Sequence, residues 1–212
     1  MLIPIGNIYG FIVAMTRKYG IDETHGVRHS MNVYEYSQKI FAKEVKKVPM
    51  LIDQERLIYT SALLHDLCDH KYIDEREGKK EIGNFLMTQS YQEKEIKEIS
   101  KIISTMSYSK IKVSGVPNHG NIQKAFQIVR ESDLLDSYDV DRCILYDMLK
   151  KDTRFEKSYE NAKLIFDERM FKYLDDYHIV TEEGRKLAEN LEIQSKNRIE
   201  EIKKSISNNY TK

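Results

Sequence analysis

The chain has 212 residues, of which 41% are hydrophobic and 32% charged, a composition typical of a folded globular protein rather than a disordered one. Its 34 lysine and arginine residues balance its 34 aspartate and glutamate residues, so no net charge draws the chain to nucleic acid or to an anionic membrane. Three prolines and nine glycines are few for a β-sandwich or barrel with many turns, and they favour long helices.

Apolar residues recur at helical spacing along most of the chain. The pattern starts near Ile8 and returns in seven later segments: 29–40, 57–68, 82–86, 96–106, 122–135, 144–149 and 162–170. A final segment mixes six acidic with six basic residues between Glu182 and Lys204, as in a solvated helix. We therefore expect one all-α domain over residues 1–212 with eight or nine helices, including a terminal helix over 181–205 and a polar tail over 206–212.

Three local features refine this expectation. Glycine and proline pairs between Ser107 and Asn121 predict a loop, and Asp22 is a candidate helix N-cap. The two cysteines, Cys68 and Cys143, are too few for a disulfide framework and predict free thiols in a reducing compartment. Because the apolar start of the chain is short and followed by its positive charges, we expect a cytoplasmic protein without a signal peptide or membrane span.

The histidines and acids of the chain are unevenly placed. His65 and Asp66 end a segment whose pattern is that of a buried helix, where ionisable groups are costly unless they pair or bind a cation. His25 and His29 are four residues apart, but no glutamate lies between them, which excludes the H-E-x-x-H zinc-protease motif. Asp133 ends another apolar stretch. Taken singly, each of these residues also has an ordinary structural explanation as a helix cap, a helix-end charge or a core-edge histidine.

Taken together, the residues resemble a known family. His29, then His65-Asp66, then Asp133, each on a separate expected helix, resemble the H…HD…D pattern of the HD superfamily of metal-dependent phosphohydrolases. The flanking residues 22–33 and 62–69 are also similar, although Asn32 stands where the family usually has arginine. Residues 103–109 and 131–136 resemble a bacterial-type branch that hydrolyses nucleoside triphosphates. The resemblance covers the chain from about Ile8 to Ile202.

The resemblance implies a single metal centre with His29, His65, Asp66 and Asp133 as ligands. Two imidazoles and two carboxylates suit a divalent transition metal better than calcium or magnesium. Manganese is the first expectation, with cobalt, nickel, iron and zinc as alternatives. Members with two metals have further histidines before the last aspartate, and the scarcity of histidines there favours one ion.

The resemblance also suggests roles for other residues. Asp69 takes the place of a carboxylate thought to act as acid and base, whereas His25, Lys71 and Lys110 are candidates for binding substrate, with Arg130 as a further cation. The expected substrate is a small phosphorylated molecule, best a nucleotide. The reaction is either cleavage of a triphosphate to monophosphate and pyrophosphate, or of a monophosphate to nucleoside and phosphate.

Two other readings stay open at this stage. One is a regulatory or ligand-binding module that keeps the HD fold and the metal without useful turnover. The other is an all-α interaction protein without metal. No nucleic-acid or membrane partner is expected, and the sequence leaves open whether the chain is a monomer or a homodimer.

Overall fold

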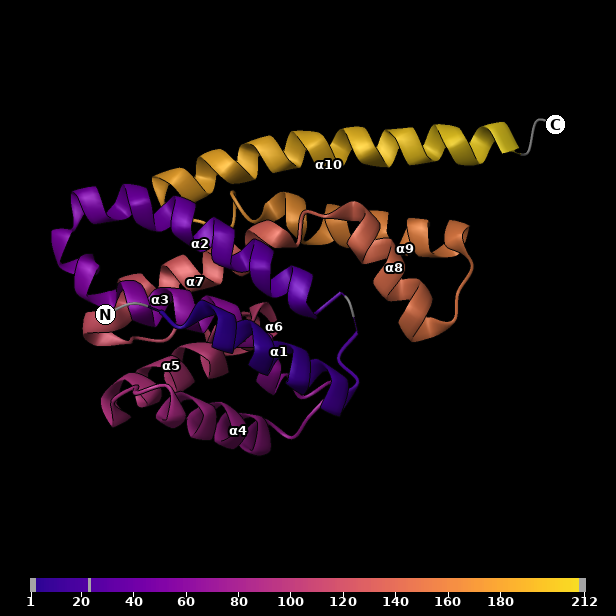
Figure 1. Ribbon diagram of the computed structural model, residues 1–212. Coiled ribbons are helices and arrows are strands. Elements are labelled where there is room, and N and C mark those ends of the chain that lie inside the picture. The colour runs from indigo at the N-terminus through magenta and orange to yellow at the C-terminus, as the bar shows by residue number, and fades with distance from the viewer. Residues whose placement is uncertain (1–2, 23, 210–212) are drawn as a thin grey trace. The chain divides into compact units, whose positions relative to one another are not determined.

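The computed structural model describes residues 3–22 and 24–209, and in this part of the chain all regular structure is helical (Figure 1). The predicted all-α class is confirmed, and the described residues form ten α-helices where eight or nine were expected. The α-helices are α1 (Ile5–Tyr19), α2 (Val27–Lys47), α3 (Glu55–Leu64), α4 (Glu75–Thr88), α5 (Glu93–Thr105), α6 (Tyr108–Ser114), α7 (Gln123–Asp136), α8 (Val140–Lys151), α9 (Phe155–Glu168) and α10 (Glu182–Asn209). The 3₁₀ helices are η1 (Pro49–Gln54), η2 (His65–Cys68), η3 (Gly120–Ile122) and η4 (Met170–Lys172).

Three local expectations were wrong. The first part of the predicted loop is the helix α6, because the Ser107 side chain caps it by accepting the Lys110 N–H and Ile111 is buried against the core. The terminal helix continues to Asn209, beyond the predicted end at 205, and residues 210–212 lie outside the described part of the chain. Asp22 is not an N-cap, since the residue that precedes α2 is Gly26.

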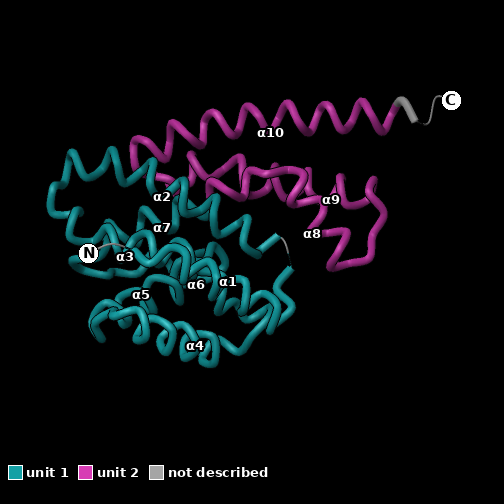
Figure 2. Tube along the Cα trace, in the orientation of Figure 1, with its two compact units in different colours: residues 1–133 teal, residues 134–212 magenta. Residues whose placement is uncertain are grey.

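The chain divides into two compact units, residues 1–133 and 134–212 (Figure 2). In the first unit, α3 is the central helix: it packs against α2 and α5, and all its residues from Leu57 to Leu64 are buried. Helix α4 packs against α5 and against η2, the turn that continues α3. This burial agrees with the mostly apolar sequence of the segment, and it places the end of α3 inside the unit.

The second unit is built from α8, α9 and α10. Helices α8 and α9 pack against each other, and α10 contacts both. The Ser195 hydroxyl on α10 donates a 2.6 Å hydrogen bond to the carbonyl oxygen of Tyr138, which precedes α8. The side chains of Leu145 and Leu149 on α8 are exposed, and the helix buries Val140, Ile144 and Asp147.

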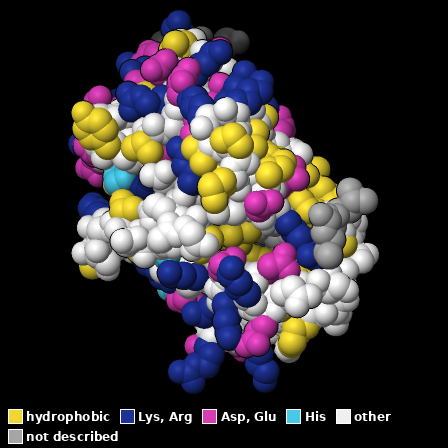
Figure 3. Space-filling view, turned by 90° about the vertical axis from the view of Figure 1, so that its left-hand side faces the viewer, with side chains coloured by type: hydrophobic (Ala, Val, Ile, Leu, Met, Phe, Trp, Pro, Cys, Tyr) yellow, Lys and Arg dark blue, Asp and Glu magenta, His cyan; other side chains and the backbone are white. Residues whose placement is uncertain are grey.

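The surface matches the neutral composition. On the face shown in Figure 3, acidic side chains lie among the basic ones. Many of them pair within one helix, as Lys97 does with Glu93 at 2.6 Å on α5. Cys68 and Cys143 are free thiols, as predicted. No helix within the described residues has both the length and the apolar character needed to cross a bilayer.

A buried carboxylate joins two helices of the first unit. Glu44 of α2 is 3% exposed, and its carboxylate lies 2.6 Å from Nζ of Lys124 on α7 and 3.2 Å from Nζ of Lys47. Burial alone would raise the pKa of Glu44, but the hydrogen bonds from Lys124 and Lys47 outweigh burial and lower it. The pair therefore stabilises the contact between α2 and α7.

Substitution of Glu44 by glutamine is expected to lower the free energy of unfolding by about 1–3 kcal/mol at neutral pH, because the charged hydrogen bonds are lost. A carboxylate whose pKa is lowered on folding contributes stability above its ordinary pKa of 4.5, and that contribution is lost as the pH falls through the folded-state value. Urea unfolding at neutral and at acidic pH should show the difference between variant and wild type closing in acid. Glu35→Gln, which breaks the exposed pair with Lys39, is the control, with an expected effect below about 1 kcal/mol. A difference as large in acid as at neutral pH would contradict this account.

Candidate metal centre

Three separate segments of the first unit bring the predicted ligands together. His29 lies in the first turn of α2, which begins at Val27. His65 and Asp66 open η2, where the chain tightens from α3 into a 3₁₀ turn. Asp133 belongs to α7. Since α2 and η2 both adjoin the central helix α3, the two histidines reach the same buried place, with exposed fractions of 3% and 5%.

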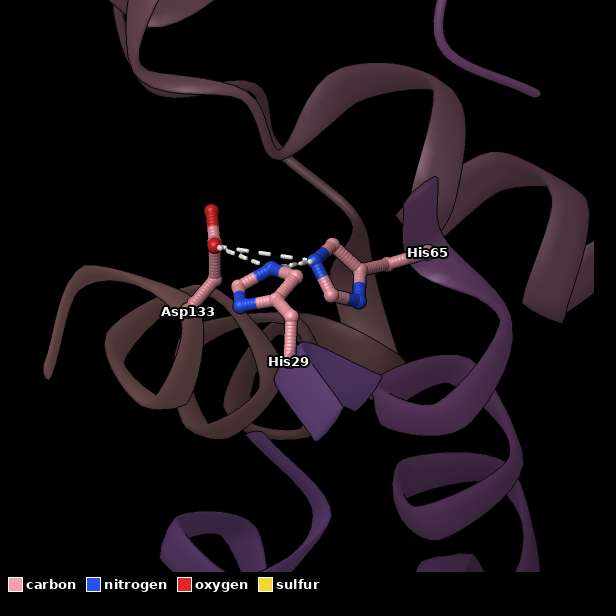
Figure 4. Close-up of side chains that lie close together, drawn as sticks. All are labelled: His29, His65 and Asp133. Atoms are coloured by element: carbon pink, nitrogen blue, oxygen red, sulfur yellow. Dashed lines mark hydrogen bonds and ion pairs between the residues drawn. The ribbon is translucent and has the colours of Figure 1, made fainter. Parts of the chain in front are cut away.

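The polar ends of these side chains converge. The Nε2 atoms of His29 and His65 are 3.0 Å apart, and each lies 3.5 Å from Oδ1 of Asp133 (Figure 4). Asp66 also contacts both imidazoles, with Oδ2 at 3.1 Å from Nε2 of His29 and Oδ1 at 3.3 Å from Nε2 of His65. The four residues that the sequence brings together as candidate ligands are therefore neighbours in the fold.

The protonation of His65 follows from its other nitrogen. Its Nδ1 lies 2.8 Å from the carbonyl oxygen of Ala62, which can only accept, so Nδ1 carries a hydrogen. In the neutral ring, Nε2 then carries no hydrogen, and its lone pair faces Nε2 of His29 and two carboxylates. Asp66 Oδ2 is buried and has no hydrogen bond of good geometry within the described residues. An arrangement of electron-pair donors of this kind requires a positive charge at its centre, supplied by a proton or by a metal ion.

The electrostatics of the cluster point the same way. Burial alone would lower the pKa of His65, but the Asp66 and Asp133 carboxylates outweigh burial and raise it. Burial would raise the pKa of Asp133 and of Asp66, yet the two imidazoles hold both carboxyl pKa values below their usual range. The carboxylates thus stay ionised at neutral pH, and the His65 imidazole attracts a proton that a metal ion would have to displace.

The donor set fits a divalent metal. His29, His65 and Asp133 each offer one ligand atom, and these atoms all lie within 4.8 Å of one another. Asp66 touches both imidazoles but does not belong to this mutually close set. Mixed imidazole and carboxylate ligands suit manganese, iron, cobalt, nickel or zinc. Across the described residues, no second such group of histidine, cysteine and acidic side chains is found.

His119, the remaining histidine of the predicted loop, has a structural place. Its Nε2 lies 2.9 Å from the Thr105 hydroxyl, and its ring packs edge-on against Phe126 at a centroid distance of 4.6 Å. The Thr105 hydroxyl also donates to the carbonyl of Lys101, so it accepts from His119. His119 is thus a core histidine and not a member of the cluster.

Asp69 lies just beyond the cluster. It follows the end of η2 with an extended backbone, so it does not continue the helical turn that carries Asp66. Its carboxylate accepts the N–H of Lys71 at 3.0 Å and pairs with His70 and with Nζ of Lys71, at 3.3 and 3.5 Å. Its polar contacts are therefore with the turn that follows η2, and not with the imidazoles of His29 and His65.

The predicted substrate-binding residues are dispersed. His25 precedes α2, so it does not share a helix face with His29, but its ring lies edge-on to that of His29 at 6.1 Å. Lys71 pairs with Asp69, and Nζ of Lys110 donates to Glu75 at 2.9 Å and to the Ser104 carbonyl at 2.8 Å. Sequence reasoning missed Tyr72, whose hydroxyl lies 3.1 Å from Nδ1 of His25. No local pattern connects two residues 47 positions apart.

A glycine lets α4 pack directly on η2. A Cβ atom at Gly78 would lie 2.8 Å from Cα and Cβ of Cys68 and 3.0 Å from the Leu67 carbonyl oxygen, distances that force a shift. Helix α4 thus packs against the backbone of η2, the turn that carries His65 and Asp66. Gly83 on the same helix is different, because its Cβ would meet only Ile96, at an ordinary 3.7 Å.

The variant Gly78→Ala is expected to lose about 1–3 kcal/mol of stability through overpacking. It should also bind metal about 10- to 100-fold more weakly, as is usual when the support behind metal ligands is disturbed. Gly83→Ala is the matched control and should gain about 0.5–1 kcal/mol from better helix propensity, with unchanged metal binding. Thermal unfolding and metal titration of both variants make the comparison. Equal behaviour of the two would show that the close contact at Gly78 does not matter.

Comparison with known proteins gives the fold but no family. No family model matches the chain, and no curated protein matches it. Among solved structures, the chain is similar to the crystal structure of a structural-genomics target from Lactobacillus plantarum. The two have 17% sequence identity and a TM-score of 0.66, over 97% of this chain and 99% of the other. At this identity, the likeness shows a shared fold alone.

Proposed function

We propose that this protein is a divalent-metal-dependent phosphohydrolase of the HD type. One observation carries the proposal: two imidazole nitrogens and two carboxylates from three segments meet at distances of 3.0 to 3.5 Å. Their order along the chain, His29, then His65-Asp66, then Asp133, is the order of the HD pattern. The cluster supports a metal centre, and the order supports the reaction class.

These four residues would hold a divalent ion, which would supply Lewis acidity to polarise a phosphoryl group and to make water a stronger nucleophile at neutral pH. Phosphoryl transfer needs this help because its transition state is stabilised chiefly by positioning and charge neutralisation. The chain prepares the ligands in advance: the Ala62 carbonyl fixes the tautomer of His65, and the imidazoles keep Asp66 and Asp133 ionised. Manganese is the first candidate for the ion, and cobalt, nickel, iron and zinc, which nitrogen and oxygen ligands also suit, are the alternatives.

Asp69 is proposed as the group that accepts and returns protons. It lies three residues after Asp66, and the Lys71 N–H holds its carboxylate in place. Lys71 and Lys110 are proposed to bind phosphate. Both already have carboxylate partners, Asp69 and Glu75, so phosphate binding requires the ammonium groups to exchange partners. Such an exchange costs little between partly exposed groups.

The proposed substrate is a nucleotide. The resemblance of residues 103–109 and 131–136 to a branch that cleaves nucleoside triphosphates favours pyrophosphate release. Release of phosphate from a nucleoside monophosphate is the other form of the same chemistry.

The test is a panel of nucleoside triphosphates, nucleoside monophosphates and simple phosphate esters, assayed with manganese, cobalt, nickel and magnesium, with products identified. We expect turnover of a nucleotide with manganese or cobalt, weak turnover with magnesium, and none in chelator. Detection of pyrophosphate or of phosphate shows which bond is cleaved. A protein that binds metal but hydrolyses nothing on the panel would be a regulatory or ligand-binding module, and the proposal would be wrong.

A further inference from the structure

A hydrogen-bonded group flanks the metal cluster and joins the segments on either side of it. Asp22, Thr24 and His25 precede α2, which carries His29, whereas Tyr72 follows η2, which carries His65 and Asp66. The Tyr72 hydroxyl donates to Oδ2 of Asp22 at 2.6 Å, across 50 positions of the chain. The Thr24 hydroxyl donates to the other oxygen of the same carboxylate. Asp22 is therefore an acceptor for two hydroxyl groups.

This arrangement fixes the hydrogens around His25. Its Nδ1 lies 2.9 Å from the Thr24 hydroxyl oxygen and 3.1 Å from that of Tyr72. A hydroxyl has one hydrogen to donate, and both hydroxyls give theirs to Asp22. Neither can donate to His25, so Nδ1 of His25 must carry a hydrogen and donate it. In the neutral ring, Nε2 is then the acceptor nitrogen.

The same contacts hold the ring beside the cluster. The His25 ring lies at 5.6 Å from the Tyr72 ring and edge-on to the His29 ring at 6.1 Å, and its side chain is 17% exposed. Nδ1 is also 3.7 Å from the Asp22 carboxylate. Position and tautomer of His25 thus depend on Asp22 through the two hydroxyl groups.

We infer that Asp22 and Tyr72 are positioning residues that hold His25 in the Nδ1–H tautomer beside the His29/His65 cluster. With the ring neutral, the Nδ1–H tautomer makes Nε2 an acceptor, which suits a hydrogen-donating group, such as a substrate hydroxyl or the attacking water, and not a bare phosphoryl oxygen. This last step rests on the proposed function. The tautomer and its dependence on Asp22 do not.

The tautomer can be read directly by ¹⁵N NMR of imidazole-labelled protein, metal-free and zinc-loaded. A pH of about 8 keeps most imidazoles neutral. The His25 signals are those lost in His25→Gln. We expect a protonated Nδ1 and an unprotonated Nε2 in the wild type. In Asp22→Asn, the hydroxyls lose their shared anionic acceptor and can donate to Nδ1, so the population should shift to Nε2–H. Tyr72→Phe, a second and milder variant, should shift it less.

The control is Tyr91→Phe, which removes a hydroxyl bonded to Thr60 at 2.7 Å in the same unit. It should leave the His25 tautomer unchanged. Asp22→Asn and Tyr72→Phe should retain the wild-type metal content and lose about tenfold in kcat/KM on the best substrate, as expected for one lost positioning hydrogen bond.

The outcomes separate the two proposals. A wild-type His25 protonated on Nε2, or a tautomer that neither Asp22→Asn nor Tyr72→Phe changes, overturns this inference whatever the enzyme does. The expected tautomers with wild-type kcat/KM in both variants overturn the positioning role. The expected tautomers in a wild type that hydrolyses nothing support the assignment of Asp22 and Tyr72 while the proposed function fails.

Discussion

Replacement of His65 by alanine is expected to abolish metal binding, with a loss of at least about 100-fold in affinity, and to remove hydrolysis with it. His65 contacts His29, Asp66 and Asp133, so the change takes away one ligand and the partner of three others. Loss of an outer-shell partner alone costs about 10- to 100-fold in metal affinity or activity, and loss of a ligand costs more. Calorimetric titration of metal-free protein with manganese, together with the hydrolysis assay, measures both effects.

The matched control is His70→Ala. His70 is five residues away, its side chain is 75% exposed, and it contacts Asp69. This variant removes an imidazole from the same stretch of chain without touching the cluster, so metal affinity should stay within about twofold of the wild type. If His65→Ala bound manganese as tightly as His70→Ala does, the four-residue cluster would not be the metal centre.

The variant Asp69→Asn is expected to bind metal normally and to lose about 10²- to 10⁴-fold in turnover, the usual contribution of a general acid or base. Asparagine keeps the size of the side chain and can still accept the Lys71 N–H, so the turn after η2 should be preserved. What is lost is the ability to take up a proton. Metal content and kcat across the neutral pH range are the measurements.

Asp74→Asn is the control for the loss of a carboxylate nearby. Asp74 caps α4 by accepting the N–H groups of Arg76 and Glu77, and asparagine caps a helix about as well. The turnover of the Asp74→Asn variant should equal that of the wild type. Wild-type turnover in Asp69→Asn would make Asp69 a bystander. Loss of metal in that variant would place Asp69 among the ligands, and the assignment of roles would be wrong.

The ligand cluster could be predicted because its signal is chemical and local. His65 and Asp66 stand out against the eight buried residues that precede them in α3, which are apolar or aromatic except for Thr60 and Ser61. The resemblance to the H…HD…D pattern then adds His29 and Asp133 to this pair. Helix packing brings these side chains together, so one site is formed by three segments that are distant in the sequence.

The features that sequence reasoning missed depend on packing across the fold. The tight η2 turn takes Asp69 out of the helix, and α4 packs behind it through Gly78, a residue with no signal of its own in the pattern. Tyr72 and Asp22 meet because two loops flank the same cluster. On α8, the helical spacing of Leu145 and Leu149 does not reveal that both side chains are exposed. Periodicity identifies the apolar face of a helix, but it does not identify the element that packs against that face.

The most direct test of the metal-dependent reaction is one titration with two readings. Metal-free wild-type protein is supplied with increasing manganese, and bound metal and initial rate of nucleotide hydrolysis are measured in the same samples. We expect the rate to rise in proportion to bound manganese and to level off at about one ion per chain, because the four ligands form one centre. A rate that does not follow bound metal, or that levels off only at two ions per chain, would contradict it.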